Sequence, residues 1–247
     1  MRSEVYWTDQ YSPGNGLQVS PGIPDKIDVA IVGSGYTGLA AARVLANANI
    51  SVAVLDKHTI GWGASSRNGG MATPGLKQDI YKIYKKYGIE YAREFWKASV
   101  DAIDLLENII EEDQIECDWS RNGHIALACK QSHYNKFPEY SDWIKRELGH
   151  DKTIVPKEDI KTEIGSEFYF GGLSDEISAG LQPSKFLNGL ARSVSELGVY
   201  LCEGCSVESI ISSGSSYEVV TTLGSIKAKD VIIATNGYTD TLVPELK

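Results

Sequence analysis

One glycine-rich turn, Gly33-Ser-Gly35-Tyr-Thr-Gly38, limits the folds open to this chain more than any other feature. A short apolar run, DVAIV at residues 28–32, precedes it and is typical of a strand buried on both faces. Strong helix formers follow in LAAARVLANANI, and a second apolar run, residues 51–55, ends at Asp56. This order makes a βαβ unit of about 30 residues. The sequence therefore predicts an α/β fold built on a parallel sheet.

The three glycines have separate tasks in such a turn. The first allows the tight turn out of the strand, the second lets a pyrophosphate approach the backbone, and the third lets the helix pack close to the sheet. A helix that begins near Tyr36 would direct its first amides at the phosphates. Asp56 lies 23 residues after Gly33, where a carboxylate can accept the ribose hydroxyls of adenosine. We expect a dinucleotide site; the alternative is a βα turn without a ligand and a merely exposed Asp56.

The acid and the loop that follows it narrow the choice of nucleotide. A carboxylate at position 56 repels a 2′-phosphate, which disfavours NADP and leaves FAD or NAD. Residues 58–70, HTIGWGASSRNGG, are small and glycine-rich, whereas an NAD dehydrogenase normally has another crossover helix there. Amides and hydroxyls of this loop could line the rest of the pyrophosphate and the flavin end of FAD. The alternative is a flexible surface loop.

Composition excludes several classes of protein. The net charge, 24 − 33 = −9, argues against a nucleic-acid-binding surface but not against one nucleotide held by backbone amides. A hydrophobic content of 42% with 23% charged residues argues against disorder. The sequence has no apolar stretch long enough for a membrane span and no signal-peptide pattern at its N-terminus. Four cysteines are too few for a disulfide scaffold, so we expect a cytoplasmic protein.

Four segments together carry a family resemblance. DVAIVGSGYTGLAAARVLA and VLDKHTIGWGASSRNGG resemble the N-terminal half of the FAD-dependent D-amino-acid-oxidase-like (DAO) oxidoreductases, especially the gamma-glutamylputrescine oxidase-type branch of amine oxidases. Residues 61–70 resemble that branch's GxGASGRNGG, with Ser66 in place of the usual glycine. AGLQPSKFLNGLARSVSELGVYLCEG resembles its Pro-led crossover helix and strand, and VIIATNGYT resembles a strand and turn close to the FAD pyrophosphate.

The resemblance implies a Rossmann-like FAD-binding domain of the glutathione-reductase type with a partial α+β substrate domain. We expect an N-terminal arm at 1–25, a discontinuous FAD-binding domain at 26–74 and 184–247, and a helical segment with part of a substrate domain at 75–183. Periodicity and turn residues predict helices over 76–114, 132–148, 156–164 and 183–197. They predict strands at 124–128, 168–173, 199–201, 205–211 and 231–234, and a hairpin of 217–222 with 225–228.

The resemblance also assigns residues to the cofactor. Val207 would contact adenine through its backbone, and Arg67 would either polarise the flavin or remain an ordinary surface arginine. No residue can be named as catalytic. The implied FAD contacts are Gly33, Ser34, Gly35, Tyr36, Thr37, Gly38, Asp56, Lys57, Gly63, Ala64, Ser65, Arg67, Asn68, Gly69, Gly70, Val207, Ala234, Thr235 and Gly237.

The reaction implied by the family is oxidation of a C–N bond in a small amine or amino acid. Hydride would pass to the flavin, the imine would hydrolyse, and oxygen or another acceptor would reoxidise the flavin. Members of the family are longer, so we expect this chain to be a fragment or to need a second chain that supplies the C-terminal half. Two alternatives stay open, a noncatalytic FAD-binding subunit or fragment and, less favoured, an NAD-linked dehydrogenase.

Other candidate sites are weaker. Cys202-Glu-Gly-Cys205 could be a redox pair or half of a zinc site, but it follows a predicted strand and lacks a second pair of ligands. We therefore expect no metal. The histidines show no metal-binding spacing, and His58 is the hardest to dismiss because it adjoins the cofactor loop. The four histidines of the chain are His58, His124, His133 and His150.

Overall fold

The computed structural model describes residues 5–11, 17–240 and 242–243. Contacts divide the chain into two compact units, which we call the first unit (1–69, 110–117 and 182–247) and the second unit (70–109 and 118–181). Unlike the expected boundaries, this division sets no N-terminal arm apart, places 70–74 in the second unit, and places 110–117 in the first unit. That segment joins the first unit because its Ile115 packs so closely on Gly189 that a Cβ at the glycine would lie 2.3 Å from the isoleucine side chain.

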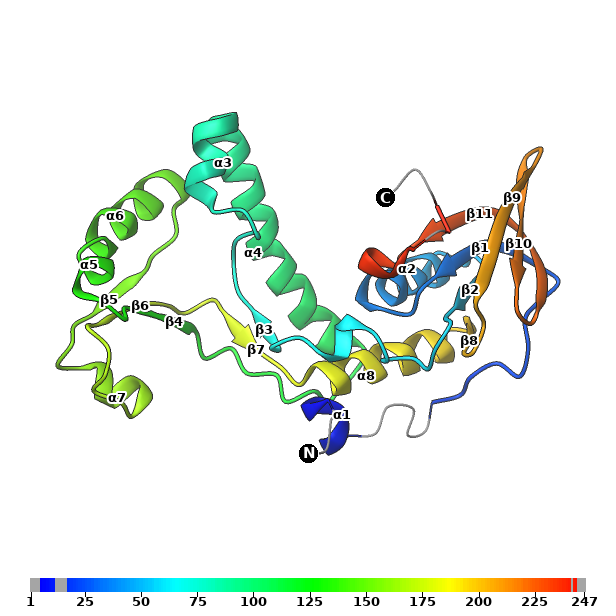
Figure 1. The fold of residues 1–247 in the computed structure, drawn as a ribbon, viewed down its shortest axis with the longest axis horizontal. Helices are drawn as coiled ribbons and strands as arrows, with labels where there is room; N and C mark the ends of the chain where they lie inside the picture. The colour runs from blue at the N-terminus through cyan, green and yellow to red at the C-terminus, as the bar shows by residue number, and fades with distance from the viewer. Residues whose placement is uncertain (1–4, 12–16, 241, 244–247) are drawn as a thin grey trace. The chain divides into compact units, whose positions relative to one another are not determined.

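The first unit is built on a six-stranded sheet with the order β8-β2-β1-β11-β10-β9 (Figure 1). Strands β8, β2, β1 and β11 run parallel, whereas β10 is antiparallel to both β11 and β9. The strands are β1 (Lys26–Val32), β2 (Val52–Leu55), β8 (Tyr200–Cys202), β9 (Val207–Ser213), β10 (Ser216–Thr221) and β11 (Gly224–Ile233). The parallel α/β arrangement predicted from the glycine turn is confirmed.

Apolar strands and two helices form the core of this unit. All four residues of β2 are buried, as are Ala30 and Ile31 of β1, which is the burial expected of strands covered on both faces. Helix α2 (Tyr36–Asn47) follows the glycine turn, and α8 (Pro183–Glu196) packs against it. Pro183 stands in the first turn of α8 and Gly198 follows its end with φ +83°, as the sequence predicted. Short 3₁₀ turns lie at η1 (Ala64–Ser66) and η2 (Asn236–Tyr238).

The end of the sheet corrects one prediction. Residues 224–233 form one continuous strand, not a short hairpin strand followed by a separate buried strand. The start of β11 pairs with β10, from Thr221 opposite Gly224 to Tyr217 opposite Ala228, and its remainder pairs with β1. Lys227, Lys229 and Asp230 therefore stay in the strand although their sequence resembles a break, because this stretch pairs with β1 and Lys227 also pairs with β10.

The N-terminal segment is not a free arm over its described part. Residues 6–10 form a short helix, α1 (Tyr6–Gln10), which the sequence did not predict. Further along, the amide of Ser20 donates to the Leu201 carbonyl at 2.8 Å, and the Leu201 amide donates to the Ser20 hydroxyl at 3.1 Å. Strand β8 is the edge of the sheet, so these bonds satisfy groups that an open edge would expose. The rest of the expected arm, residues 1–4 and 12–16, lies outside the described residues.

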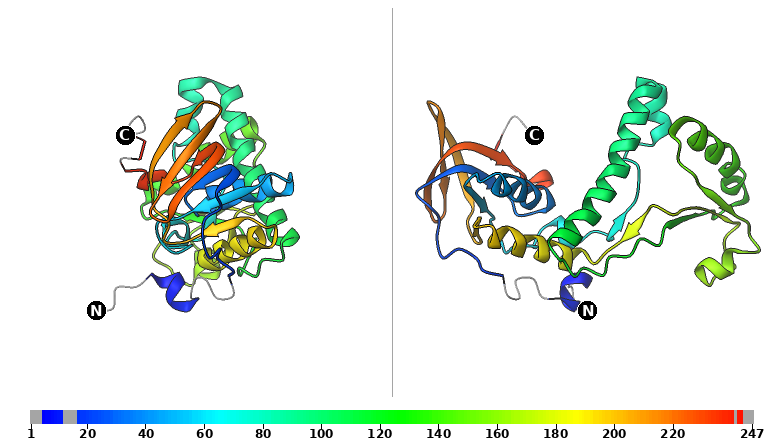
Figure 2. Two further views of the ribbon diagram at one scale, coloured as in Figure 1. Left: turned by 90° about the vertical axis from the view of Figure 1, so that its right-hand side faces the viewer. Right: turned by 180° about the vertical axis from the view of Figure 1, so that it is seen from behind.

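The second unit combines helices with small antiparallel sheets. Its cluster of buried apolar residues includes Ile83, Trp96, Trp143 and Ile144. A three-stranded sheet has the order β4-β6-β5, and β3 pairs with β7 (Figure 2). The elements are β3 (Met71–Ala72), α3 (Ile80–Tyr87), α4 (Ile89–Glu112), β4 (His124–Leu127), α5 (Gln131–Tyr134), α6 (Phe137–Leu148), β5 (Thr153–Val155), α7 (Ile160–Ile164), β6 (Gly172–Asp175) and β7 (Ala179–Gly180).

Three predictions in this unit need correction. The long helix over 76–114 is interrupted at Gly88, whose φ of +91° is incompatible with a continuing helix, and the helix over 132–148 is divided by a turn before Phe137. The strand predicted at 168–173 begins only at Gly172, because Gly171 takes φ +132° and Phe168 is 73% exposed. Strand β5 was not predicted; its three residues are too few to show periodicity.

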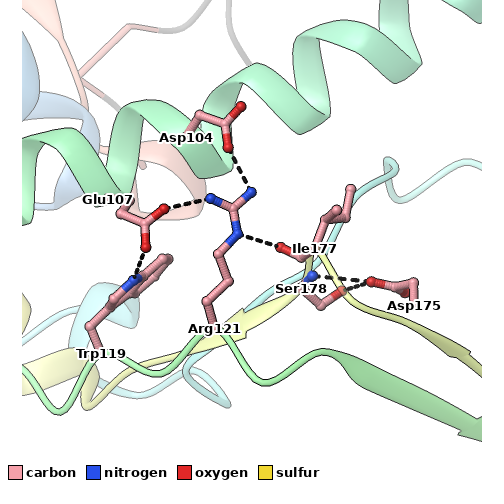
Figure 3. Close-up of polar contacts among 7 residues, drawn as sticks. All are labelled: Asp104, Glu107, Trp119, Arg121, Asp175, Ile177 and Ser178. Atoms are coloured by element: carbon pink, nitrogen blue, oxygen red, sulfur yellow. Dashed lines mark hydrogen bonds and ion pairs between the residues drawn. The ribbon is translucent and has the colours of Figure 1, made fainter.

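An ion-pair network anchors the chain after α4 to that helix (Figure 3). The Arg121 guanidinium contacts Asp104 at 2.6 Å and Glu107 at 2.5 Å, and its Nε donates to the Ile177 carbonyl at 3.2 Å. Trp119 Nε1 donates to the other Glu107 oxygen at 2.8 Å. Hydrogen bonds from Trp119 and Arg121 lower the pKa of Glu107, so this carboxylate stays ionised. None of the helices in the described ranges has the length and apolar character that a bilayer crossing needs.

Candidate functional site

The first unit encloses a cavity of about 740 Å³ beside the carboxyl ends of its central strands. This volume lies within the range of about 300–1,000 Å³ found for small-molecule sites. Its walls come from five segments: the glycine turn after β1, the end of β2 with the following loop, Leu187 of α8, the start of β9, and the turn after β11. Ligands of open α/β sheets bind at this position. All of the lining residues belong to the first unit.

Most of the predicted cofactor residues line this one cavity. They are Gly33, Ser34, Gly35, Tyr36, Thr37, Asp56, Lys57, Gly63, Ala64, Ser65, Val207, Ala234, Thr235 and Gly237. The remaining predicted residues do not line it; these are Gly38, Arg67, Asn68, Gly69 and Gly70.

The glycine turn has a different constraint at each glycine. Gly33 has φ +104°, and a Cβ there would lie 2.8 Å from the Ala234 carbonyl oxygen. A Cβ at Gly38 would lie 2.0 Å from the Gly33 oxygen, so the start of α2 packs directly on the turn. A Cβ at Gly35 would meet, among described residues away from its own turn and helix, only the Ser65 hydroxyl, at 3.0 Å. The first and third glycines are therefore required by packing, whereas the second presents bare backbone to the cavity.

The N-terminus of α2 suits an anion. Its first turn contains no acidic residue, and Gly35 at the N-cap position provides no side chain to cap it. One amide, that of Tyr36, donates to the Ser65 hydroxyl at 3.1 Å. The positive end of the helix dipole therefore faces the cavity without a compensating carboxylate in its first turn.

Asp56 is held in place by three donors at the end of β2. Its Oδ2 accepts from the amide of Ser34 at 2.8 Å and from the Ser34 hydroxyl at 2.5 Å. Its Oδ1 accepts from the amide of His58 at 2.9 Å. An ionised carboxylate offers about four acceptor positions, so at least one remains for a ligand hydroxyl. A ribose hydroxyl could donate to this remaining position.

The segment that contains Val207 is fixed against the end of β2. The amide of Cys205 donates to the Asp56 carbonyl at 2.8 Å, and the Glu203 carboxylate accepts from the Ile60 amide at 2.6 Å. These bonds hold the segment that leads into β9 against the end of β2 and the loop after it, and residues of both segments line the cavity. The position of Val207 is thus determined by backbone pairing, which suits a residue whose expected contact is through its backbone.

Sequence reasoning did not assign three aromatic residues to the cavity. His58, Trp62 and Tyr238 all line it. The His58 and Trp62 rings stack with centroids 4.0 Å apart, and Tyr238 meets Trp62 edge-on at 5.9 Å. Trp62 could have been singled out from the sequence, because it is a large aromatic residue in a loop, 58–70, that consists mostly of small residues.

The remaining predicted residues support the loop from outside the cavity. Arg67 Nε donates to the Trp62 carbonyl at 2.7 Å, and its guanidinium carbon lies 4.8 Å from the centre of the Trp62 ring. Asn68 donates from its side chain to the Ser65 carbonyl at 2.9 Å and accepts from Trp7 Nε1 at 2.7 Å through its backbone. Gly70 belongs to the second unit, where its carbonyl accepts from the Leu181 amide.

The C-x-x-C pair has the environment of structural cysteines. Cys202 and Cys205 are both buried, and burial raises the pKa of Cys202 to about 11 and also raises that of Cys205. A raised pKa disfavours the thiolate that redox chemistry and metal binding need. Within the described ranges, no three His, Cys, Asp or Glu residues are grouped to hold a metal ion.

The sequence matches the family "DAO: FAD dependent oxidoreductase" over residues 28–247. The chain belongs to the DAO family. It is 34% identical to the "Probable oxidoreductase OrdL" of Haemophilus influenzae over 219 residues, which are 88% of this chain and 51% of that protein. It is 32% identical to the "Gamma-glutamylputrescine oxidoreductase" of Escherichia coli over 239 residues, 96% of this chain and 55% of that protein.

Solved structures agree with this DAO-family assignment. The glycine oxidase of Geobacillus kaustophilus superimposes with a TM-score of 0.70 at 25% identity, over 85% of this chain and 55% of that one. The chain thus spans about half the length of the curated relatives it matches. The predicted Rossmann-like α/β fold and the resemblance to the gamma-glutamylputrescine oxidase-type branch are confirmed. FAD is the cofactor of the family to which this chain belongs.

Proposed function

We propose that the cavity of the first unit binds FAD and that the chain serves an oxidoreductase acting on the C–N bond of a small amine or amino acid. The observation that supports the site best is the joint position of the glycine turn and Asp56 on one cavity. Gly33–Thr37 and the N-terminus of α2 would hold the pyrophosphate, and Asp56 would hold the adenosine ribose. The negative net charge of the chain is compatible with this mode of phosphate binding, because backbone amides and a helix N-terminus need no basic side chains.

The other walls would hold the rest of the cofactor. Val207 would contact adenine through its backbone, and Gly63–Ser65 would border the pyrophosphate. Ala234, Thr235 and Gly237 would close the cavity from the end of β11. Arg67 and Asn68 donate to carbonyls of the loop around Ser65, so we assign these two residues a positioning role and not direct contact.

FAD, when bound, accepts the hydride that leaves the carbon next to the amine nitrogen. The substrate class is supported by relatives named for gamma-glutamylputrescine and glycine. Hydride removal needs the neutral amine, so the rate should rise with pH as the substrate loses its proton. We also propose a cytoplasmic location, which the small number of cysteines, four in 247 residues, favours.

The test is a cofactor titration followed by an activity screen. The purified chain, stripped of flavin, is titrated with FAD and with NAD while intrinsic and flavin fluorescence are recorded. We expect saturable binding of FAD and none of NAD at equal concentrations; the reverse order would support the NAD-linked alternative. Peroxide release over a panel of polyamines and amino acids then separates an oxidase from a noncatalytic FAD-binding chain. Turnover without any added polypeptide would exclude the expectation that a second chain supplies the C-terminal half.

A further inference from the structure

Two aromatic side chains join opposite walls of the cavity. Trp62 stands in the loop after β2, and Tyr238 ends the 3₁₀ turn η2 after β11. Their rings meet edge-on with centroids 5.9 Å apart and planes at 65°. The contact continues at the neighbouring residue, because a Cβ at Gly63 would lie 3.9 Å from the Tyr238 ring. Both side chains line the cavity, so a ligand inside it lies beside a bridge between its walls.

The Trp62 side of this bridge is fixed. Its ring stacks on His58 with planes at 26°, and its carbonyl accepts from Arg67 at 2.7 Å. The amide of His58 in turn donates to Asp56 at 2.9 Å. These bonds tie the backbone of the Trp62 loop to the end of β2, and the indole, which is 42% exposed, is held by its stacking on the His58 ring.

The Tyr238 side is more exposed and is held by local hydrogen bonds. Tyr238 is 56% exposed, and the turn that carries it is only three residues long. The turn is bounded by Asn236 and Asp240, which have φ values of +48° and +50°, an uncommon conformation for residues other than glycine. The Tyr238 amide donates to the Thr235 carbonyl at 2.9 Å, and the Thr235 and Thr239 hydroxyls lie 2.7 Å apart. The Thr239 hydroxyl donates to the Asn236 carbonyl at 2.7 Å, and the Leu242 amide donates to the Thr239 carbonyl at 3.1 Å. All of these bonds join residues three or four positions apart, so none of them ties the turn to a distant strand or helix. Short, exposed segments with few buried contacts open at little cost in free energy.

We infer that Trp62 and Tyr238 form a latch that controls how FAD enters and leaves the cavity. Tyr238 moves away from the fixed Trp62 to admit FAD and returns to close the wall behind it. The inference rests on the proposed binding of FAD at this cavity. It assigns a role in FAD exchange to two residues outside the glycine turn. A latch slows association and dissociation together, whereas a side chain that only contacts bound FAD slows dissociation alone.

The experiment measures both rates of FAD exchange on the full chain by stopped-flow flavin fluorescence. In Tyr238→Ala we expect both rates to rise, with dissociation about tenfold faster. Trp62→Ala should behave in the same way, and the double variant should be no faster than either single one. Tyr238→Phe should restore wild-type rates, because the edge contact needs the ring and not the hydroxyl. Tyr217→Ala is the matched control, since Tyr217 is a half-exposed tyrosine of β10 that does not line the cavity.

Three results would overturn the latch. They are unchanged rates in Tyr238→Ala, a rise in the dissociation rate alone, and equal changes in Tyr217→Ala. In all three cases the wild-type chain still binds FAD, so the proposed function survives. Absence of FAD binding by the wild-type chain would instead overturn the proposed function and the latch together.

Discussion

The amide and the hydroxyl of Ser34 both donate to the same oxygen of Asp56, at 2.8 and 2.5 Å. Ser34 lies inside the glycine turn and Asp56 ends the neighbouring strand, so this pair joins the expected pyrophosphate and ribose positions into one rigid element. Ser34 is only 2% exposed, and the carboxylate it holds has little freedom to rotate. The acid is thus oriented by the fold before any ligand arrives, which lowers the entropy lost on binding.

Asp56→Asn should weaken FAD binding by about tenfold or more, a loss of about 1.4 kcal/mol. The amide keeps the size of the side chain, but its NH₂ group must face the donors of Ser34 or His58, and the charge that favours ribose hydroxyls is lost. Isothermal titration with FAD measures the change. Asp28→Asn is the matched control, because Asp28 pairs with Ser51 and Lys229 and does not line the cavity. Equal weakening in both variants would contradict the role of Asp56.

Gly35→Ala and Gly38→Ala should separate binding from folding. A Cβ at Gly38 meets backbone at 2.0 Å, so we expect that variant to lose about 3 kcal/mol of unfolding free energy or not to fold. A Cβ at Gly35 meets only the Ser65 hydroxyl at 3.0 Å, which can rotate, so the protein should fold with a change within about 1 kcal/mol. Its FAD affinity should nevertheless fall sharply. Normal FAD binding by a folded Gly35→Ala protein would exclude a pyrophosphate at this turn.

Much of the first unit could be predicted because its signals are local. The turn, both flanking strands and helices α2 and α8 follow from runs of apolar residues, Pro183 and the glycines. The continuous strand β11 could not be predicted, since Lys227, Lys229 and Asp230 stay extended only through pairing with distant strands. The contribution of Tyr238 to the cavity also depends on tertiary packing. The orientation of Asp56 depends on Ser34, a contact that no sequence period encodes.

Arg121→Lys should destabilise the second unit by about 1–2 kcal/mol. Lysine cannot contact Asp104, Glu107 and the Ile177 carbonyl together, because it lacks the planar fork of the guanidinium (Figure 3). Urea unfolding followed by circular dichroism measures the loss. Arg146→Lys serves as control; its side chain is 65% exposed, and we expect a change below about 0.5 kcal/mol. Similar losses in both variants would mean that the network contributes no more than an ordinary surface pair.

His150 should make the second unit less stable in mild acid. The side chain is buried, its Nε2 has no hydrogen-bond partner among the described residues, and its ring meets Trp96 edge-on at 5.0 Å. Burial, with the nearby Lys152 charge, lowers the pKa of His150 from its ordinary value of 6.5. The unfolded chain therefore binds the proton more readily, and stability is lost as the pH falls below about 6.5 towards the folded-state pKa.

His150→Phe keeps the ring contact and removes the titration. Urea unfolding at pH 7, 6 and 5 should show the wild-type protein losing stability faster than the variant over this range. Parallel pH profiles for the two proteins would show that His150 does not cause the loss.

The central claim is that the cavity beside Ser34 and Asp56 binds FAD through the pyrophosphate and the ribose. Equilibrium titration of the flavin-free chain with FAD, FMN and NADP tests it most directly. We predict saturation at one FAD per chain, with much weaker binding of FMN, which lacks the adenosine ribose, and of NADP, whose 2′-phosphate Asp56 repels. Binding of FMN or NADP as tight as that of FAD, or no binding of FAD, would contradict the account.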